Sequence, residues 1–361
     1  MTMFIVGPVE MYPETKQVRM KDFSYFRSPE YSEMASQCLT GLSSLLGNDE
    51  PNSLIYMASS GTGAMEAVVE NCVSEKDKCL VVNGGTFGRR FCELLAYHGK
   101  TFSEIDLEWN ERLSDRHLLR YENQGYTMLF VNLCETQTGQ LYDIELLSSF
   151  CRRNGMMLLV DAISTFLADA YDMNKYGIDL TIISSQKGLA LSPGAAFVSF
   201  SRRMMDKVIQ SPAPSSKYFD FKDFLTDVVR GQTPYTPPVF IMYELREMLK
   251  RFEKEGGPDT HLAVVKRKAE YFRTEAVNAG FRVPDYPLSN VLTPLYFDDI
   301  DAERIVSALR DDCGIYVNPC GGHLAKKMLR VAHIGNTTME DIDILIEKLL
   351  LTVEKIKGRK E

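Results

Sequence analysis

The sequence has 361 residues, of which 45% are hydrophobic and 25% are charged, as is typical of a globular protein with room for two domains. The formal net charge of −8 argues against a nucleic-acid-binding surface, and no apolar stretch is long enough to cross a membrane. The 8 cysteines show no disulfide-like spacing, and no signal peptide is visible. We therefore expect a cytoplasmic protein.

Short apolar runs alternate with helical patterns over the first two-thirds of the chain. The runs are rich in Val, Ile, Leu, Met and Phe without strict alternation, which is typical of strands covered on both faces. Helical patterns separate several of them, so the sequence predicts an α/β fold with a mostly parallel sheet between helices. The expected strands span residues 54–58, 79–83, 128–133, 156–160, 180–184 and 195–200.

The order of elements changes near residue 240. Three prolines interrupt regular structure within residues 231–238, and a long helical pattern follows to about Glu255. We expect a large domain over residues 1–240, with residues 1–18 as an N-terminal arm, and a smaller C-terminal α+β domain over residues 241–361. Its expected elements are strands at 292–297, 315–317 and 328–331 and helices at 302–310 and from 339 to about 355.

A glycine- and serine-rich turn at residues 59–64 (Ser-Ser-Gly-Thr-Gly-Ala) follows a predicted strand and opens a helix. Free backbone N–H groups and the helix dipole converge there, and the hydroxyls of Ser60 and Thr62 add donors, so the turn can cradle a phosphate. A turn that only caps the helix is the simpler interpretation. Glu66 stands where a dinucleotide-binding motif needs its third glycine, which favours a phosphate cofactor other than NAD.

Two charged residues follow later strands. Asp161 comes at the carboxyl end of a buried strand, where ligands bind in open α/β sheets, although an aspartate there can simply cap a helix. Lys187 follows Ser-Ser-Gln just past another strand. Most lysines are solvated surface groups, but partial burial at this place would lower the pKa of Lys187 toward neutrality, as a Schiff-base amine requires.

These features together fit pyridoxal 5'-phosphate (PLP). The cofactor needs a lysine, a carboxylate facing its pyridinium nitrogen, a phosphate cradle and a flat group over its ring. Phe87, within residues 83–89 (Asn-Gly-Gly-Thr-Phe-Gly-Arg), supplies the flat group in a loop, although an aromatic residue there is also typical of a core.

The same motifs resemble the class V aminotransferases of PLP fold type I. The resemblance is to the branch of alanine–glyoxylate, serine–pyruvate and 2-aminoethylphosphonate–pyruvate aminotransferases. It covers nearly the whole chain, from Gly7-Pro8-Val9-Glu10 to the stretch 329–335 (Leu-Arg-Val-Ala-His-Ile-Gly). It implies a large and a small domain and a homodimer with shared active sites.

The resemblance also implies roles for individual residues. Lys187 and Asp161 are the catalytic residues, and Arg330 binds the substrate α-carboxylate. Thr136 could reach the ring hydroxyl, while Thr233 and Thr236 lie in a segment donated to the neighbouring subunit's phosphate. The implied cofactor-binding set is Ser60, Gly61, Thr62, Phe87, Thr136, Asp161, Ile163, Gln186, Lys187, Thr233 and Thr236.

The expected activity is amino transfer from a small donor, such as alanine or serine, to glyoxylate or pyruvate. Transfer from 2-aminoethylphosphonate to pyruvate is the alternative. A cysteine desulfurase or lyase on the same fold is less favoured, because Gln186 stands where desulfurases usually carry histidine. A binding protein that has lost the chemistry is disfavoured because the lysine, the aspartate and the arginine are all present. Cys320 and His323 are not expected to bind a metal, since nothing nearby supplies further ligands.

Overall fold

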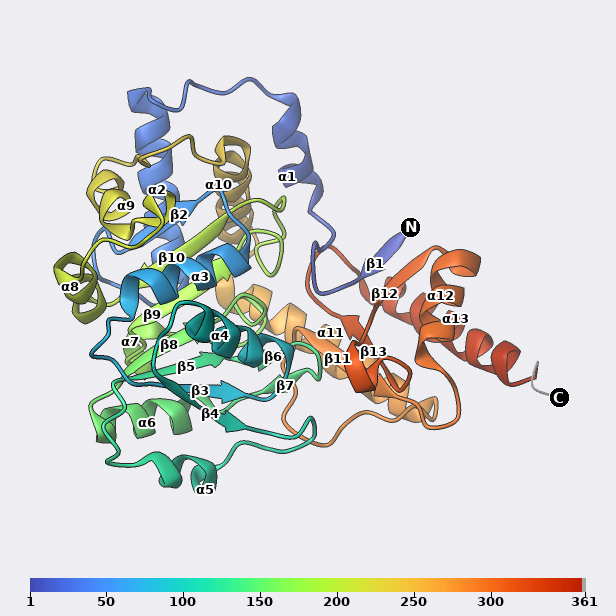
Figure 1. Ribbon diagram of the computed structural model, residues 1–361. Coiled ribbons are helices and arrows are strands. Elements are labelled where there is room, and N and C mark those ends of the chain that lie inside the picture. Colours follow the sequence, from blue (N-terminus) through green and yellow to red (C-terminus); the bar gives the residue numbers. More distant parts are fainter. Residues whose placement is uncertain (359–361) are drawn as a thin grey trace.

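A seven-stranded sheet forms the centre of the larger part of the molecule in the computed structural model, which describes residues 1–358 (Figure 1). Only β10 runs against the other strands of this sheet. The six strands expected from the sequence are present to within one residue at each end, and β4 is added. In order across the sheet they are β2 (Leu54–Met57), β10 (Ala196–Phe200), β9 (Leu180–Ser184), β8 (Met157–Asp161), β5 (Met128–Asn132), β3 (Cys79–Asn83) and β4 (Phe102–Asp106).

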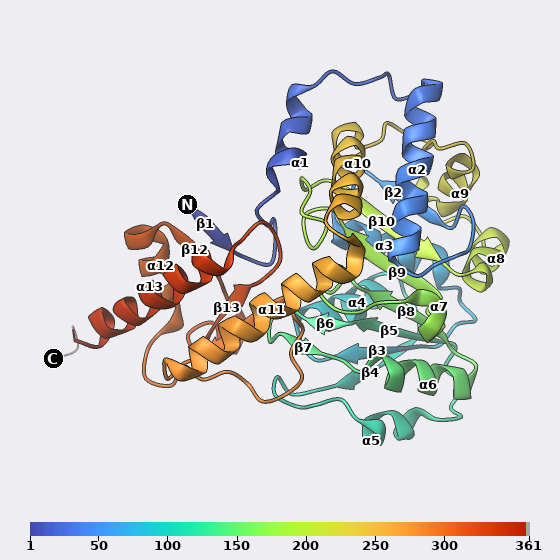
Figure 2. The same ribbon diagram turned by 180° about the vertical axis from the view of Figure 1, so that it is seen from behind.

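Helices cover both faces of this sheet. Helices α3 and α4 lie on the face toward the viewer in Figure 1, and α6 and α7 lie on the face toward the viewer in Figure 2. Because both faces are covered, every residue of β3, β5, β9 and β10 is buried, which explains the continuous apolar runs. The helices of this part are α1 (Pro13–Gln17), α2 (Pro29–Leu45), α3 (Gly61–Cys72), α4 (Thr86–Tyr97), α5 (Asp115–Leu118), α6 (Ile144–Asn154), α7 (Met173–Tyr176), α8 (Arg202–Gln210), α9 (Phe221–Val228) and α10 (Val239–Lys254).

The smaller part is built on a four-stranded sheet in the order β1-β12-β13-β11, formed by β1 (Thr2–Phe4), β12 (Ile315–Pro319), β13 (Met328–Ala332) and β11 (Leu292–Tyr296). Helices α12 (Ala302–Cys313) and α13 (Met339–Lys357) pack with it. Strand β1 pairs in parallel with β12, so the expected N-terminal arm begins as an edge strand of the C-terminal sheet. The chain therefore passes from the small sheet to the large one within its first residues.

Two helices connect the parts. Leu245 of α10 belongs to the core of the large sheet, whereas Phe272 of α11 (Gly257–Asn278) belongs to the core of the small sheet. We therefore propose the turn at Gly256 as the domain boundary, in place of residue 240. No helix among residues 1–358 is long and apolar enough to cross a membrane.

Candidate active site

The residues singled out in the sequence gather at the carboxyl ends of the parallel strands. Ser60 follows β2, Asp161 is the last residue of β8, and Lys187 comes three residues after the end of β9. In open α/β sheets the loops at these ends form the ligand site, because the strand ends bring separate segments together.

The phosphate turn is a capped helix N-terminus. The Ser60 hydroxyl accepts a hydrogen bond from the Gly63 N–H at 3.1 Å, which leaves the N–H groups of Gly61 and Thr62 without partners inside the helix. A Cβ atom on Gly61 would lie 2.6 Å from Cδ1 of Ile163. A side chain at Gly61 would have to displace Ile163, so the turn lies directly against the residue expected beneath the cofactor ring.

Asp161 is a buried carboxylate of which one oxygen has no hydrogen-bond partner among residues 1–358. Oδ1 accepts from the Ile163 N–H at 2.8 Å, and no other hydrogen bond to this side chain exists among residues 1–358. Burial raises the pKa of Asp161 to about 7, opposed by the Ile163 N–H and Lys187 and assisted by Glu135. A positively charged N–H donor beside the second oxygen of Asp161 would offset the cost of burying the carboxylate. A pyridinium nitrogen is such a donor.

Lys187 shows the opposite shift. Burial lowers the pKa of Lys187 to about 8, with Asp161 raising it and Arg330 lowering it. The backbone of Gly7 lies against this side chain, since a Cβ atom on Gly7 would meet Cδ of Lys187 at 2.6 Å and Nζ at 2.9 Å. The Val9 N–H also donates to the carbonyl of Gln186 at 3.1 Å. The N-terminal segment therefore packs over the lysine, a contact that nothing in the sequence signals.

Phe87 lies in the first turn of helix α4, not in the loop expected from its glycine neighbours. Arg90 stands one turn further on, with its guanidinium 4.9 Å from the centre of the Phe87 ring. Arg90 also donates to the Thr62 hydroxyl at 3.2 Å, so it brings positive charge to the phosphate turn. Its spacing of three residues from Phe87 is the one sequence feature that could have indicated it.

Arg330 reaches across from the small sheet. Its Nη1 donates to the carbonyl of Thr136 at 2.7 Å and its Nη2 to the carbonyl of Pro319. Its Nε is buried without a partner among residues 1–358, and burial lowers the pKa of Arg330. Thr136 itself is buried beside this arginine.

Glu135 organises this loop and was not recognised in the sequence. The carboxylate is fully buried and accepts from the backbone N–H groups of Phe87 at 3.1 Å and Gln137 at 3.0 Å. It therefore ties the start of α4 to the loop that holds Arg330.

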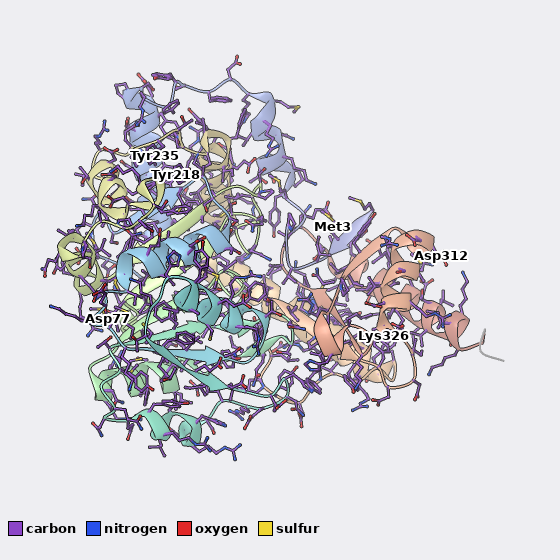
Figure 3. The ribbon with its side chains drawn as sticks, in the orientation of Figure 1. Met3, Asp77, Tyr218, Tyr235, Asp312 and Lys326 are labelled. Carbon is purple, nitrogen blue, oxygen red and sulfur yellow. The ribbon has the colours of Figure 1, made fainter. Side chains whose placement is uncertain are left out.

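The remaining expected residues are Gln186, Thr233 and Thr236. The Gln186 amide oxygen accepts from Ser184 at 2.7 Å and stays beside the lysine. Thr233 is buried and its hydroxyl donates to the carbonyl of Tyr235 at 2.6 Å. Tyr235 stacks on Tyr218, and Figure 3 labels the two residues next to each other. Thr236 is exposed, and no hydrogen bond joins it to the site within residues 1–358.

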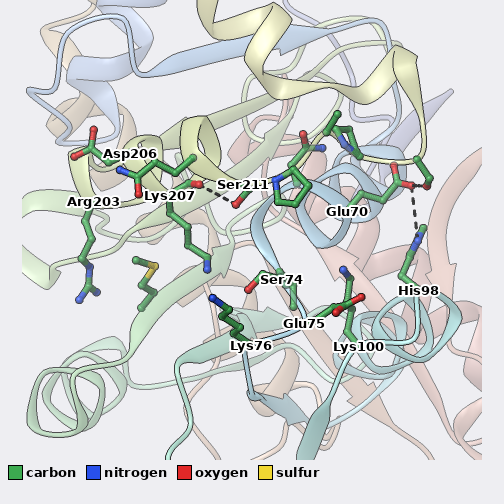
Figure 4. Close-up of a pocket in the computed structure, with 18 residues that line it drawn as sticks. Glu70, Ser74, Glu75, Lys76, His98, Lys100, Arg203, Asp206, Lys207 and Ser211 are labelled. Carbon is green, nitrogen blue, oxygen red and sulfur yellow. Dashed lines mark hydrogen bonds and ion pairs between the residues drawn. The ribbon is translucent and has the colours of Figure 1, made fainter.

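A wide cavity of about 970 Å³ lies elsewhere, beside the amino end of β8 (Figure 4). Its lining includes Glu70, Lys76, His98, Lys207 and Pro212 but none of the expected site residues. Among residues 1–358 no group of three or more His, Cys, Asp or Glu side chains could hold a metal ion.

Comparison with known proteins identifies the family. The model of the class-V aminotransferases matches residues 27–345. The chain belongs to this family. It is a PLP-dependent transaminase with PLP fold type I, and the site fits the cofactor because a glycine cradle, a partly unpaired buried carboxylate and a buried lysine meet in it.

Individual relatives carry different names. A protein called soluble hydrogenase, small subunit, from Synechococcus sp. is 27% identical over 326 residues, 88% of this chain and 83% of that one. An L-aspartate–glyoxylate aminotransferase from Paracoccus denitrificans is 28% identical over 352 residues, 93% of this chain and 86% of that one. The crystal structure of an alanine–glyoxylate aminotransferase from Nostoc sp. is 25% identical with a TM-score of 0.91, covering 98% of this chain and 96% of that one.

Proposed function

We propose that the enzyme moves the amino group of a small amino acid, such as alanine or serine, to glyoxylate or pyruvate, with Lys187 and Asp161 as its catalytic pair. The observation that carries the proposal is the opposed shift of these two groups, which lie at neighbouring strand ends of one buried site. Strongly shifted pKa values in buried titratable groups of one site are typical of catalytic acids and bases.

Bound PLP supplies an electron sink for the Cα electrons of the amino donor. The Lys187 amine would hold the cofactor covalently, and as a free amine it would act as the base that takes the Cα proton of the donor and as the acid that returns it. Since the pKa of Lys187 is lowered to about 8, a useful fraction of the amine is neutral near physiological pH. The Asp161 carboxylate keeps a proton on the ring nitrogen.

The cofactor's phosphate is proposed to lie at the start of α3. Ser60, Gly61 and Thr62 form that turn, and the Arg90 guanidinium beside Thr62 complements the negative charge. Gln186 is proposed to reach the same phosphate. Phe87 and Ile163 are proposed to hold the two faces of the ring.

A homodimer is proposed to complete the phosphate site. Thr236 has an exposed side chain, so it can reach a second subunit, and Thr233 fixes the bend that presents it. Sedimentation at assay concentration should show a dimer, and a fully active monomer would contradict this. A cytoplasmic location is proposed from the cysteine pattern alone.

The substrate carboxylate is proposed to bind Arg330. Its buried Nε has no partner, and a guanidinium can meet a carboxylate with two parallel hydrogen bonds. Two relatives are named for glyoxylate, which supports glyoxylate as the acceptor. The alternative donor, 2-aminoethylphosphonate, has no α-carboxylate, so its use would not need this contact.

Replacing Lys187 with alanine tests the proposal. The Lys187→Ala variant should lose turnover and the borohydride-reducible link to PLP, even where PLP still binds. A panel of amino donors against glyoxylate, pyruvate and 2-oxoglutarate then fixes the substrates, and sulfide release from cysteine detects desulfurase activity. Retention of the reducible link in the variant would contradict the assignment of Lys187.

A further inference from the structure

Arg330 is held by one main-chain carbonyl from each part of the molecule. Thr136 belongs to the loop after β6 (Cys134–Glu135), which forms a separate two-stranded sheet with β7 (Gln140–Leu141) in the larger part, and Pro319 ends β12 of the small sheet. The direction of the guanidinium therefore depends on how these two backbone segments are placed relative to each other. Whatever fixes that placement also fixes the orientation of Arg330.

Two further hydrogen bonds join the same two segments. The Gln137 amide donates from Nε2 to the carbonyl of Gly321 at 2.8 Å, and the Cys320 thiol donates to the carbonyl of Gln137 at 3.4 Å. Together with the two bonds of Arg330 they close a ring, the Arg330 ring, formed by residues 136–137, 319–321 and Arg330. Gln137 is the member that bonds through both its side chain and its backbone.

Gln137 is itself fixed on the cofactor side. Its backbone N–H donates to the buried Glu135 carboxylate at 3.0 Å, and its amide oxygen accepts from the hydroxyl of Thr86, the residue before Phe87. One side chain thus links the first turn of α4 to the loop of the small domain. A shorter residue would not span the two, and an apolar one would bond to neither.

We propose that Gln137 is a positioning residue that holds Arg330 in register with the cofactor ring and so determines how tightly the carboxylate of the amino donor binds. The proposal rests on the function of Arg330 proposed above. Gln137 acts through Arg330 and not on the reacting atoms. Its loss should therefore weaken donor binding more than it slows the chemical step.

Trp109, the single tryptophan of the chain, reports on the same junction without any assay of activity. Its ring stacks on Tyr296 of β11, with centres 5.8 Å apart and planes at 3°. It also packs with Cys320 and Leu324 of the loop that Gln137 holds and with Met328 at the start of β13. A displacement of that loop should expose the indole and shift its emission to longer wavelength.

The test compares the holoenzyme with its Gln137→Met variant, which keeps the length of the side chain but neither hydrogen bond. We expect KM for the amino donor to rise about threefold to tenfold, the range for lost neutral hydrogen bonds, with kcat changed less than twofold. The Trp109 emission should shift to longer wavelength, while PLP content stays normal. Gln124→Ala is the matched control, because Gln124 also donates to a main-chain carbonyl, that of Arg120, but on the surface.

Combination with Arg330→Ala separates the possible outcomes. If Gln137 acts through Arg330, Gln137→Met should add less than twofold in the Arg330→Ala background, because coupled residues are not additive. A full additional loss there, or an unchanged KM and Trp109 spectrum in Gln137→Met alone, would overturn the proposal. A normal donor KM in Arg330→Ala alone would instead refute the carboxylate site itself, and it is recognisable because Gln137 is intact in that variant.

Discussion

Replacement of Asp161 by asparagine should stabilise the cofactor-free protein at alkaline pH although it damages the enzyme. Burial raises the pKa of Asp161 from 3.8 to about 7, so the folded chain binds a proton that the unfolded chain releases near pH 4. The stability due to this proton is complete below the unfolded pKa and is lost as pH rises through about 7. At about 1.4 kcal/mol per pKa unit, the whole effect is about 4 kcal/mol.

Asparagine has no proton to lose, so the variant should not show this loss. Its stability advantage over the wild type should grow by about 2–3 kcal/mol between pH 5 and pH 8, where most of the titration falls. Urea unfolding of both cofactor-free proteins at the two pH values measures the difference. Asp206→Asn is the control, because Asp206 is exposed and its substitution should give no such trend.

In the PLP-bound enzyme, the wild type should have the advantage over Asp161→Asn. With PLP bound, the wild-type carboxylate is proposed to face a protonated ring nitrogen. Asp161→Asn should therefore lower kcat by about 30-fold to several-thousand-fold, the range for removing one charge of a buried pair. A difference in stability that stays constant from pH 5 to pH 8 would refute the reasoning, because it would show that burial does not hold the proton on Asp161.

Two further substitutions test the substrate and lysine sides of the site. Arg330→Ala should reduce the specificity constant of the donor half-reaction by about 30-fold to several-thousand-fold, and Arg330→Lys should recover only part of it; a loss under threefold with normal PLP content would place the carboxylate elsewhere. Gly7→Ala places a methyl group 2.6 Å from Cδ of Lys187, at a residue whose backbone φ is +148°. The visible band that forms when PLP is added should therefore appear more slowly than in wild type in stopped-flow measurements. An unchanged rate would contradict the contact.

The strands of the large sheet could be predicted because burial on both faces leaves a local pattern. Residues 79–83 and 180–184 are apolar runs that match β3 and β9 at both ends. The positions of Asp161 and Lys187 could be predicted for a related reason, since a charged residue at or just after the end of a buried strand lies at the ligand edge of such a sheet. The roles of the two residues stay predictions.

Other features depend on contacts between distant segments. Strand β1 has three residues and pairs with β12 more than 300 positions away, so no local pattern marks it. Helix α11 went unpredicted, and its buried residues belong to no single core, since Val265 and Phe272 join different clusters. Gly7, Arg90 and Glu135 likewise acquire their places only when the fold brings their partners together.

The two parts of the molecule divide the work of the proposed site. The groups for the cofactor, Lys187 and Asp161, stand on the large sheet, whereas Arg330 stands on the small one. The buried environment that raises the pKa of Asp161 and lowers that of Lys187 belongs mainly to the large sheet. Substitutions in that environment should therefore alter PLP binding and the visible spectrum. Changes to Arg330 or Gln137 should leave both intact and appear in the KM of the donor. The domain that carries a residue therefore indicates which measurement its substitution will change.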